Sequence, residues 1–107
     1  MVLEYPKNFL KLKERYPELI KAYESAGELA REAGPLQDKV THLVQMAACV
    51  ALRSEGGVHS HTRRALEAGA TPEEIYHALI LLISTAGFPG VSASFSWVNH
   101  VIEKKGH

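Results

Sequence analysis

The sequence of 107 residues has very little cysteine and no excess of charge of either sign. Its single cysteine, Cys49, excludes an intramolecular disulfide framework, a CxxC redox pair and a cysteine-rich zinc site within the chain. Twelve Lys and Arg residues balance twelve Asp and Glu residues, so the formal net charge is zero. A protein that binds nucleic acid needs a basic surplus against the phosphates, and we therefore expect no nucleic-acid partner.

Long hydrophobic runs are missing as well. The most apolar stretch, residues 78–86, is far shorter than the ~20 residues that a membrane-spanning helix needs. Near the N-terminus, Glu4, Lys7 and Lys11 interrupt any apolar segment of the kind found in a secretory signal. We therefore expect a cytoplasmic protein that has no membrane partner.

What the chain does contain is apolar residues at helical spacing. Hydrophobic residues make up 46% of the sequence and aromatic residues only 7%, so most of the apolar mass is Ala, Leu, Val and Ile. Strand-like alternation of useful length does not occur, and Pro and Gly residues separate segments with a helical period. We predict an all-α fold of five or six helices in a single domain, residues 1–107. The clearest helices are predicted over residues 17–33, 36–53, 58–68, 72–86 and 91–104.

Two of the predicted helices are apolar on nearly every side, around residues 46–52 and 75–86. A helix that is hydrophobic all round has to be covered all round, and a chain of this size offers few elements to cover it. We therefore predict a homo-oligomer in which other copies of the chain cover part of these helices. In front of the second helix, Thr71 and Glu74 are spaced as in a capping box.

The residues that carry chemistry are concentrated in residues 53–64, RSEGGVHSHTRR. The double glycine predicts a turn, and the first turn of the helix that follows it favours anionic ligands. His59 and His61 are two residues apart, so on a helix they point in nearly opposite directions. His61 shares the face of the apolar stripe and is the candidate for a pocket, whereas His59 shares the face of Arg63 and is expected at the surface.

The stretch ALRSEGGVHSHTRRALEAGATPEEIYHALILLISTAGFPG resembles the carboxymuconolactone decarboxylase family, which includes the alkylhydroperoxidase D-like proteins. The matching features are His61 followed eight residues later by Gly69, then AGATPEEI and AGFPG. Upstream, residues 38–43 look like the start of the family's first core helix. The resemblance covers roughly residues 36–100. It implies an alkylhydroperoxidase D-like helical bundle, with residues 1–35 as N-terminal helices and residues 36–104 as the family core, assembled as a homo-trimer or homo-hexamer.

In the peroxidase branch, the resemblance implies a CxxC pair ahead of a motif His, and a Glu on the preceding helix that relays protons. In this chain the motif His is His61, the two cysteine positions hold Ser54 and Gly57, and the relay position holds His42. A Ser hydroxyl does not ionise near neutral pH and cannot cycle through a sulfenic acid. Cys49 lies inside the apolar helix and is interpreted as inert packing. The scaffold is therefore expected without the thiol chemistry.

The preferred interpretation is an acid/base enzyme of the decarboxylase branch, a lyase that acts on a small carboxylated lactone or oxo acid. His61 is the expected general acid or base and His42 the second titrating group, with Ser54 as a hydrogen-bond donor. No cofactor and no resident metal are expected in this interpretation. The residues expected to bind the substrate are Arg53, Arg63, Gly57 and Phe88.

Two other interpretations remain open at this stage. One is a peroxiredoxin-like antioxidant activity, which the family suggests and the missing cysteine pair opposes. The other is a family member without catalysis that binds a ligand or a metal ion. In that case the resemblance implies that His42 and His61 approach each other, and Glu55 or His59 would complete a divalent-metal site.

Overall fold

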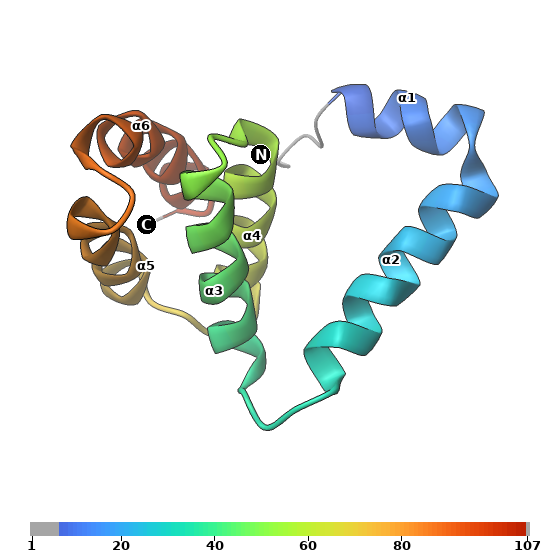
Figure 1. The fold of residues 1–107 in the computed structure, drawn as a ribbon, viewed down its shortest axis with the longest axis horizontal. Coiled ribbons are helices and arrows are strands. Elements are labelled where there is room, and N and C mark those ends of the chain that lie inside the picture. Colours follow the sequence, from blue (N-terminus) through green and yellow to red (C-terminus); the bar gives the residue numbers. More distant parts are fainter. Residues whose placement is uncertain (1–6, 107) are drawn as a thin grey trace. The chain divides into compact units, whose positions relative to one another are not determined.

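The computed structural model describes residues 7–106, and these residues form helices and no strand. Within these residues, six α-helices and one short 3-10 helix follow one another, which confirms the predicted all-α fold (Figure 1). The chain divides into two compact units, with the boundary between Leu36 and Gln37. Each unit is described by itself below.

The N-terminal unit consists of α1 (Lys7–Arg15) and α2 (Pro17–Glu32), which pack against each other. Pro17 occupies the first turn of α2, where its missing N–H costs nothing because that N–H has no partner in a helix. Ile20 is the only buried residue of these two helices. The large apolar side chains of α2 lie mostly at the surface, since Leu19, Tyr23 and Leu29 are all exposed.

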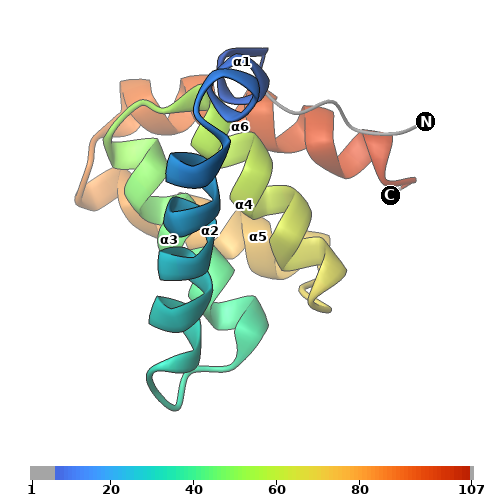
Figure 2. The same ribbon diagram turned by 90° about the vertical axis from the view of Figure 1, so that its right-hand side faces the viewer.

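The second unit contains α3 (Asp38–Ala51), α4 (Glu55–Glu67), α5 (Pro72–Ile80), the 3-10 helix η1 (Leu81–Ser84) and α6 (Phe88–Lys104). Helices α3 and α4 form an antiparallel pair, and α6 packs against α4 (Figures 1 and 2). The core of this unit is made of aliphatic side chains with almost no exposed surface. Its members include Met46, Val50, Val58, Ile75, Leu79, Val91, Val98 and Ile102.

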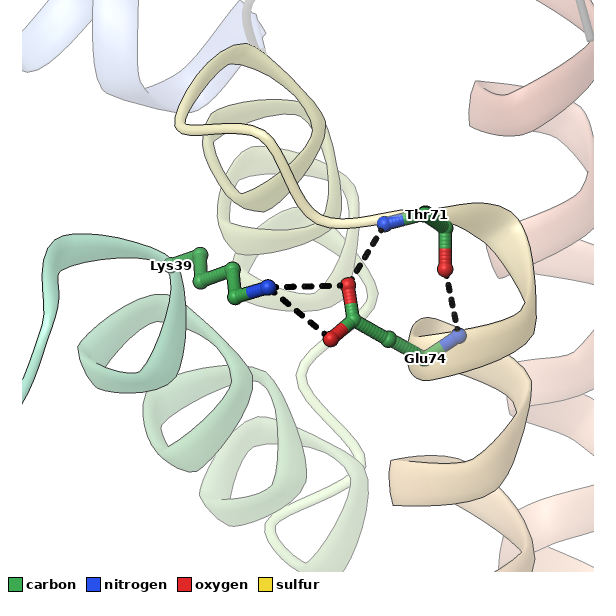
Figure 3. Close-up of polar contacts among 3 residues, drawn as sticks. All are labelled: Lys39, Thr71 and Glu74. Carbon is green, nitrogen blue, oxygen red and sulfur yellow. Dashed lines mark hydrogen bonds and ion pairs between the residues drawn. The ribbon is translucent and has the colours of Figure 1, made fainter.

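Helix α5 is joined to α3 by a cap that also forms an ion pair (Figure 3). The Thr71 hydroxyl accepts a hydrogen bond from the Glu74 backbone N–H, and the Glu74 carboxylate accepts one from the Thr71 N–H. These two bonds confirm the predicted capping box. Lys39 of α3 donates to both oxygens of the same carboxylate, at 3.3 and 3.0 Å. One side chain therefore closes the start of α5 and ties it to the first turn of α3.

Three helix boundaries differ from the prediction by three residues or more. Helix α4 begins at Glu55, so Gly56 and Gly57 lie in its first turn and do not form a separate turn before it. The long helix predicted over residues 72–86 ends at Ile80 and continues as the tighter η1. Helix α6 begins at Phe88, three residues earlier than predicted, because Pro89 is well suited to a first helical turn.

The two apolar helices are covered on one side only within this unit. Met46 and Ile75 are buried, whereas Leu52, Ile80 and Leu81 expose more than half of their surface. No helix within residues 7–106 combines the length and the hydropathy needed to cross a membrane.

Candidate active site

The rings of His42 on α3 and His61 on α4 meet across the interface between these helices. Their Nδ1 atoms are 3.2 Å apart, and the ring planes are tilted by 31°. His42 is buried, with 3% of its surface exposed, and His61 is half-buried. A hydrogen bond between two imidazole nitrogens needs one donor and one acceptor, so only one of the two Nδ1 atoms carries a proton while the contact persists. We refer to this pair as the His42–His61 dyad.

The dyad is positioned by a sharp reversal between α3 and α4. The Ser54 N–H bonds to the Cys49 carbonyl at 2.8 Å, and the Arg53 N–H bonds to the Val50 carbonyl at 3.0 Å. These two bonds form a Schellman motif, whose turning residue adopts a left-handed conformation. That residue is Arg53, the only described non-glycine residue with a positive φ, at 56°. The next helix starts at once, because the Ser54 hydroxyl accepts a hydrogen bond from the Gly57 N–H at 3.2 Å.

The cysteine of α3 lies against this helix start. A Cβ atom added to Gly57 would overlap the Cys49 Sγ, and it would lie 2.9 Å from the Ser54 Oγ and 3.1 Å from the Cys49 Cβ. The thiol therefore fills the space where a side chain at residue 57 would lie. The helix reversal thus folds α3 back onto α4, with Cys49 packed against the start of α4. Burial raises the pKa of the thiol, so the protonated form dominates near neutral pH and is a poor nucleophile.

The dyad and the Ser54 region share one interface. Gly57 and His61 are four residues apart on α4, and His42 and Cys49 are seven apart on α3, so each pair lies on one face of its helix. The structure thus brings His42 and His61 together at the α3–α4 interface, whereas Ser54 lies at the end of that interface where the chain reverses, two turns before His61 along α4. The Cys49 thiol fills the space beside Gly57, so the glycine allows α3 and α4 to pack closely. The space beside Gly57 is therefore not open to a substrate.

A second pair of histidines links α4 to α6. The rings of His59 and His100 stack at a centroid distance of 5.6 Å, and the Glu55 carboxylate lies 3.9 Å from the His59 Nε2. Burial lowers the pKa of His59, Glu55 counteracts part of that shift, and His100 adds to it. Sequence reasoning missed His100 because its partner lies 41 positions earlier in the chain, and no local pattern marks such a contact.

The remaining predicted site residues lie elsewhere. Arg63 follows His61 by two positions, on the face of His59, and its guanidinium is 3.5 Å from the Glu67 carboxylate. Phe88 begins α6 and is 64% exposed.

The histidine pairs do not combine into a metal centre within residues 7–106. His42 and His61 approach each other as the metal-binding interpretation requires, but His59 and Glu55 belong to the other pair. Among the described residues, no three side chains of His, Cys, Asp or Glu are placed to hold one ion.

The family model described as the carboxymuconolactone decarboxylase family matches residues 17–100. This protein belongs to the carboxymuconolactone decarboxylase family. The match begins at Pro17 and so includes α2, which lies outside the predicted family core of residues 36–104. Both histidines of the dyad lie within the matched region.

Two known proteins are similar to this chain, one in structure and one in sequence. The crystal structure of a carboxymuconolactone decarboxylase family protein from Legionella pneumophila is similar to the chain with a TM-score of 0.77. The two are 25% identical, and the similarity covers 90% of this chain and 86% of that one. An uncharacterised protein from Haemophilus influenzae is 33% identical over 59 residues, which is 55% of this chain. The match spans about half of that relative's length, 52%.

Proposed function

We propose that this family member is an acid/base enzyme, a lyase that acts on a small carboxylated lactone or a related oxo acid. The single observation that supports the proposal most is the Nδ1–Nδ1 contact of 3.2 Å in the His42–His61 dyad. Imidazole is the side chain whose ordinary pKa lies near neutral pH, which suits proton transfer in both directions. Two rings in direct contact can pass a proton from the substrate to the buried side of the site without a water molecule.

The two histidines have different roles in this proposal because their burial differs. His61 is half-buried and exchanges a proton with the substrate, as general base or general acid. His42 is buried and receives or returns a proton through its contact with His61. The reaction consists of proton transfer and loss of carbon dioxide, and it needs no cofactor.

The helix reversal offers groups that can bind the substrate. The Ser54 oxygen accepts the Gly57 N–H, so its own hydroxyl proton can be donated to a substrate oxygen. Arg53 precedes Ser54 and is exposed. Its guanidinium can bind the substrate carboxylate through charge-assisted hydrogen bonds. We favour Arg53 over Arg63 for this role because Arg63 is already paired with Glu67.

Thiol peroxidase chemistry has less support. It requires an ionised thiol and a second thiol that resolves the oxidised one. The chain has one cysteine, and burial raises its pKa.

The test is turnover of a panel of small carboxylated lactones and oxo acids, followed by release of carbon dioxide. On a substrate that the wild type converts, we expect His61→Ala to lower kcat/KM by ~100-fold or more, the usual contribution of general acid/base catalysis. His42→Ala is expected to have a smaller effect in the same direction. His100→Ala is the matched control, since it removes a histidine of the other pair and should leave turnover unchanged. Unchanged turnover in His61→Ala would contradict the proposal.

A further inference from the structure

We infer that Gln45 is a substrate-binding residue, whose side-chain carbonyl oxygen accepts a hydrogen bond from a hydroxyl group of the substrate. The inference rests on the proposed function for the site to which Gln45 belongs, and it narrows the substrate to a carboxylate that also carries a hydroxyl. Its binding part can be tested without turnover. The observation behind it is that the Gln45 Oε1 is buried and has no hydrogen-bond partner among the described residues.

A buried amide oxygen without a partner is unfavourable for the fold. It has lost its hydrogen bonds to water, and no bond within the protein compensates for that loss. Most buried polar atoms of folded proteins do have a partner, so each exception needs an explanation. Such exceptions are expected at binding sites, because a group that binds a ligand has to be left without a partner inside the protein.

The position of Gln45 on α3 connects it with the dyad. Gln45 follows His42 by three residues and precedes Cys49 by four, so the three lie along one side of the helix. Both neighbours contact α4, His42 through the ring of His61 and Cys49 by packing against the helix start. Met46, the other residue one turn after His42, is fully buried in the core. Gln45 therefore lies on the flank of the α3–α4 interface away from the core, between the dyad and the start of α4.

Three other buried side-chain atoms of the described residues also have no partner: the His59 Nε2, the Thr62 Oγ1 and the Ser94 Oγ. Thr62 and Ser94 have no exposed surface, so no ligand reaches their hydroxyls from the solvent. The His59 Nε2 faces the Glu55 carboxylate and belongs to the other histidine pair. Gln45 is half-buried, so its side chain reaches the solvent while its oxygen is turned inward. Of these four atoms, the Gln45 oxygen alone combines access for a ligand with a position beside the dyad.

The chemistry of this oxygen determines which ligand group fits it. An amide oxygen accepts hydrogen bonds and does not donate them. A carboxylate, a ketone or a lactone carbonyl offers no donor, whereas a hydroxyl does. Carboxylic acids are ionised near neutral pH, so the carboxyl group of the proposed substrate cannot fill this role. The substrate therefore contributes a hydroxyl in addition to its carboxylate, as in a hydroxylated lactone, a hydroxy acid or the enol form of an oxo acid.

The first experiment observes the Gln45 amide during ligand binding. Gln37 and Gln45 are the only glutamines of the sequence, so ¹H–¹⁵N spectra of the full chain labelled with ¹⁵N-glutamine show two side-chain amides. The probes are pairs of carboxylates that differ in one hydroxyl: glycolate and acetate, lactate and propionate, mandelate and phenylacetate. In at least one pair, we expect the hydroxylated member to shift the Gln45 amide signals and to bind ~10-fold more tightly than its analogue.

Gln37 is the internal control for this titration. It is exposed in front of the first turn of α3, and its side-chain amide signals should not move. If the Gln45 amide is unmoved by every probe, or if both members of every pair bind equally well, the inference is wrong.

The second experiment separates a binding role from a structural one through Gln45→Met. Methionine has about the length of glutamine but no amide oxygen. Because the substitution removes a buried oxygen without a partner, we expect a higher urea midpoint together with loss of the preference for the hydroxylated ligand. Ser94→Ala is the matched control, since it also removes a buried oxygen without a partner and should keep the preference. A lower urea midpoint in Gln45→Met, or an unchanged ligand preference, would contradict the inference.

Turnover separates this inference from the proposed function. On a hydroxylated substrate that the wild type converts, Gln45→Met should raise KM by ~10-fold with a smaller change in kcat, and it should have little effect on the analogue without the hydroxyl. If His61→Ala abolishes turnover while the hydroxyl makes no difference to binding, the proposed function stands and the inference fails. If Gln45→Met loses the hydroxyl preference while His61→Ala remains active, the inference stands and the proposed function fails.

Discussion

The thiol of Cys49 occupies the space directly above the backbone of Gly57, eight residues later in the chain. This contact explains why a glycine lies inside the first turn of α4, where its flexibility would otherwise weaken the helix by up to ~1 kcal/mol. A side chain at residue 57 and the thiol of Cys49 do not fit together in this packing.

The first prediction tests this exclusion. We expect Gly57→Ala to destabilise the protein by ~1–3 kcal/mol, because the new Cβ forces the thiol or the helices apart. In the Cys49→Ala background the same substitution should cost less, since the sulfur is gone, and the remaining cost comes from the Ser54 Oγ and the Cβ of residue 49, which lie 2.9 and 3.1 Å from the new Cβ. Urea denaturation of the four proteins gives the coupling free energy. Equal costs of Gly57→Ala in both backgrounds would show that the two residues do not compete for space.

The second prediction concerns the left-handed residue between α3 and α4. Helices α3 and α4 end in the same hydrogen-bonded motif, but the turning residue is Arg53 after α3 and Gly69 after α4. A side chain in this conformation costs ~1 kcal/mol, so Arg53→Gly should raise the free energy of unfolding by up to that amount. Gly69→Ala is the converse control. Its Cβ would meet no atom within 4 Å, and it should be destabilising through the positive φ alone. Thermal unfolding measures both effects, and a loss of stability in Arg53→Gly would contradict the prediction.

The third prediction is a dependence of stability on pH at the start of α5. The N–H of Thr71, followed by the Lys39 ammonium, lowers the pKa of the Glu74 carboxyl in the folded protein. A depressed folded-state pKa stabilises the protein above the pKa of the unfolded chain, and this contribution is lost as the pH falls through the folded-state pKa. Glu74→Gln should therefore lower the urea midpoint at pH ~6, and the difference from the wild type should shrink below pH ~4.

Lys39→Met separates the two causes of this shift. It removes the ammonium but keeps both hydrogen bonds between Thr71 and Glu74, so it should retain part of the pH dependence. If Glu74→Gln differed from the wild type equally at both pH values, the carboxylate would not be the titrating group.

The fourth prediction concerns self-association, which we propose from the apolar surface of α3, α5 and η1. Leu52 is 78% exposed and Leu81 is 59% exposed in the single chain, so both lie where another copy would gain by covering them. We expect light scattering at micromolar concentration to give a multiple of 11.8 kDa for the wild type. Leu81→Glu and Leu52→Glu should each lower that mass without loss of helical circular dichroism. A monomeric mass for the wild type would rule out the proposal.

Several features of the candidate site were accessible from the sequence because they depend on neighbours along the chain. The capping box of Thr71 and Glu74 and the opposite directions of His59 and His61 follow from helical geometry over a few residues. The predicted start of α4 is wrong because it relies on a local signal that contacts with other residues override. A double glycine is a local signal for a turn, but the Ser54 cap and the approach of Cys49 keep Gly56 and Gly57 within the helix.

The period of the apolar residues is enough to predict the helical class, and the family resemblance implies that His42 and His61 approach each other. How the two rings meet, with Nδ1 facing Nδ1 and the Asp38 carboxylate 3.9 Å from the Nε2 of the buried ring, follows only from the packing of the helices. The contact of the Cys49 thiol with the start of α4 also follows only from that packing. Local patterns specify where a helix begins and which face is apolar. The distances between side chains on different helices depend on how those helices pack, and that packing involves the whole core at once.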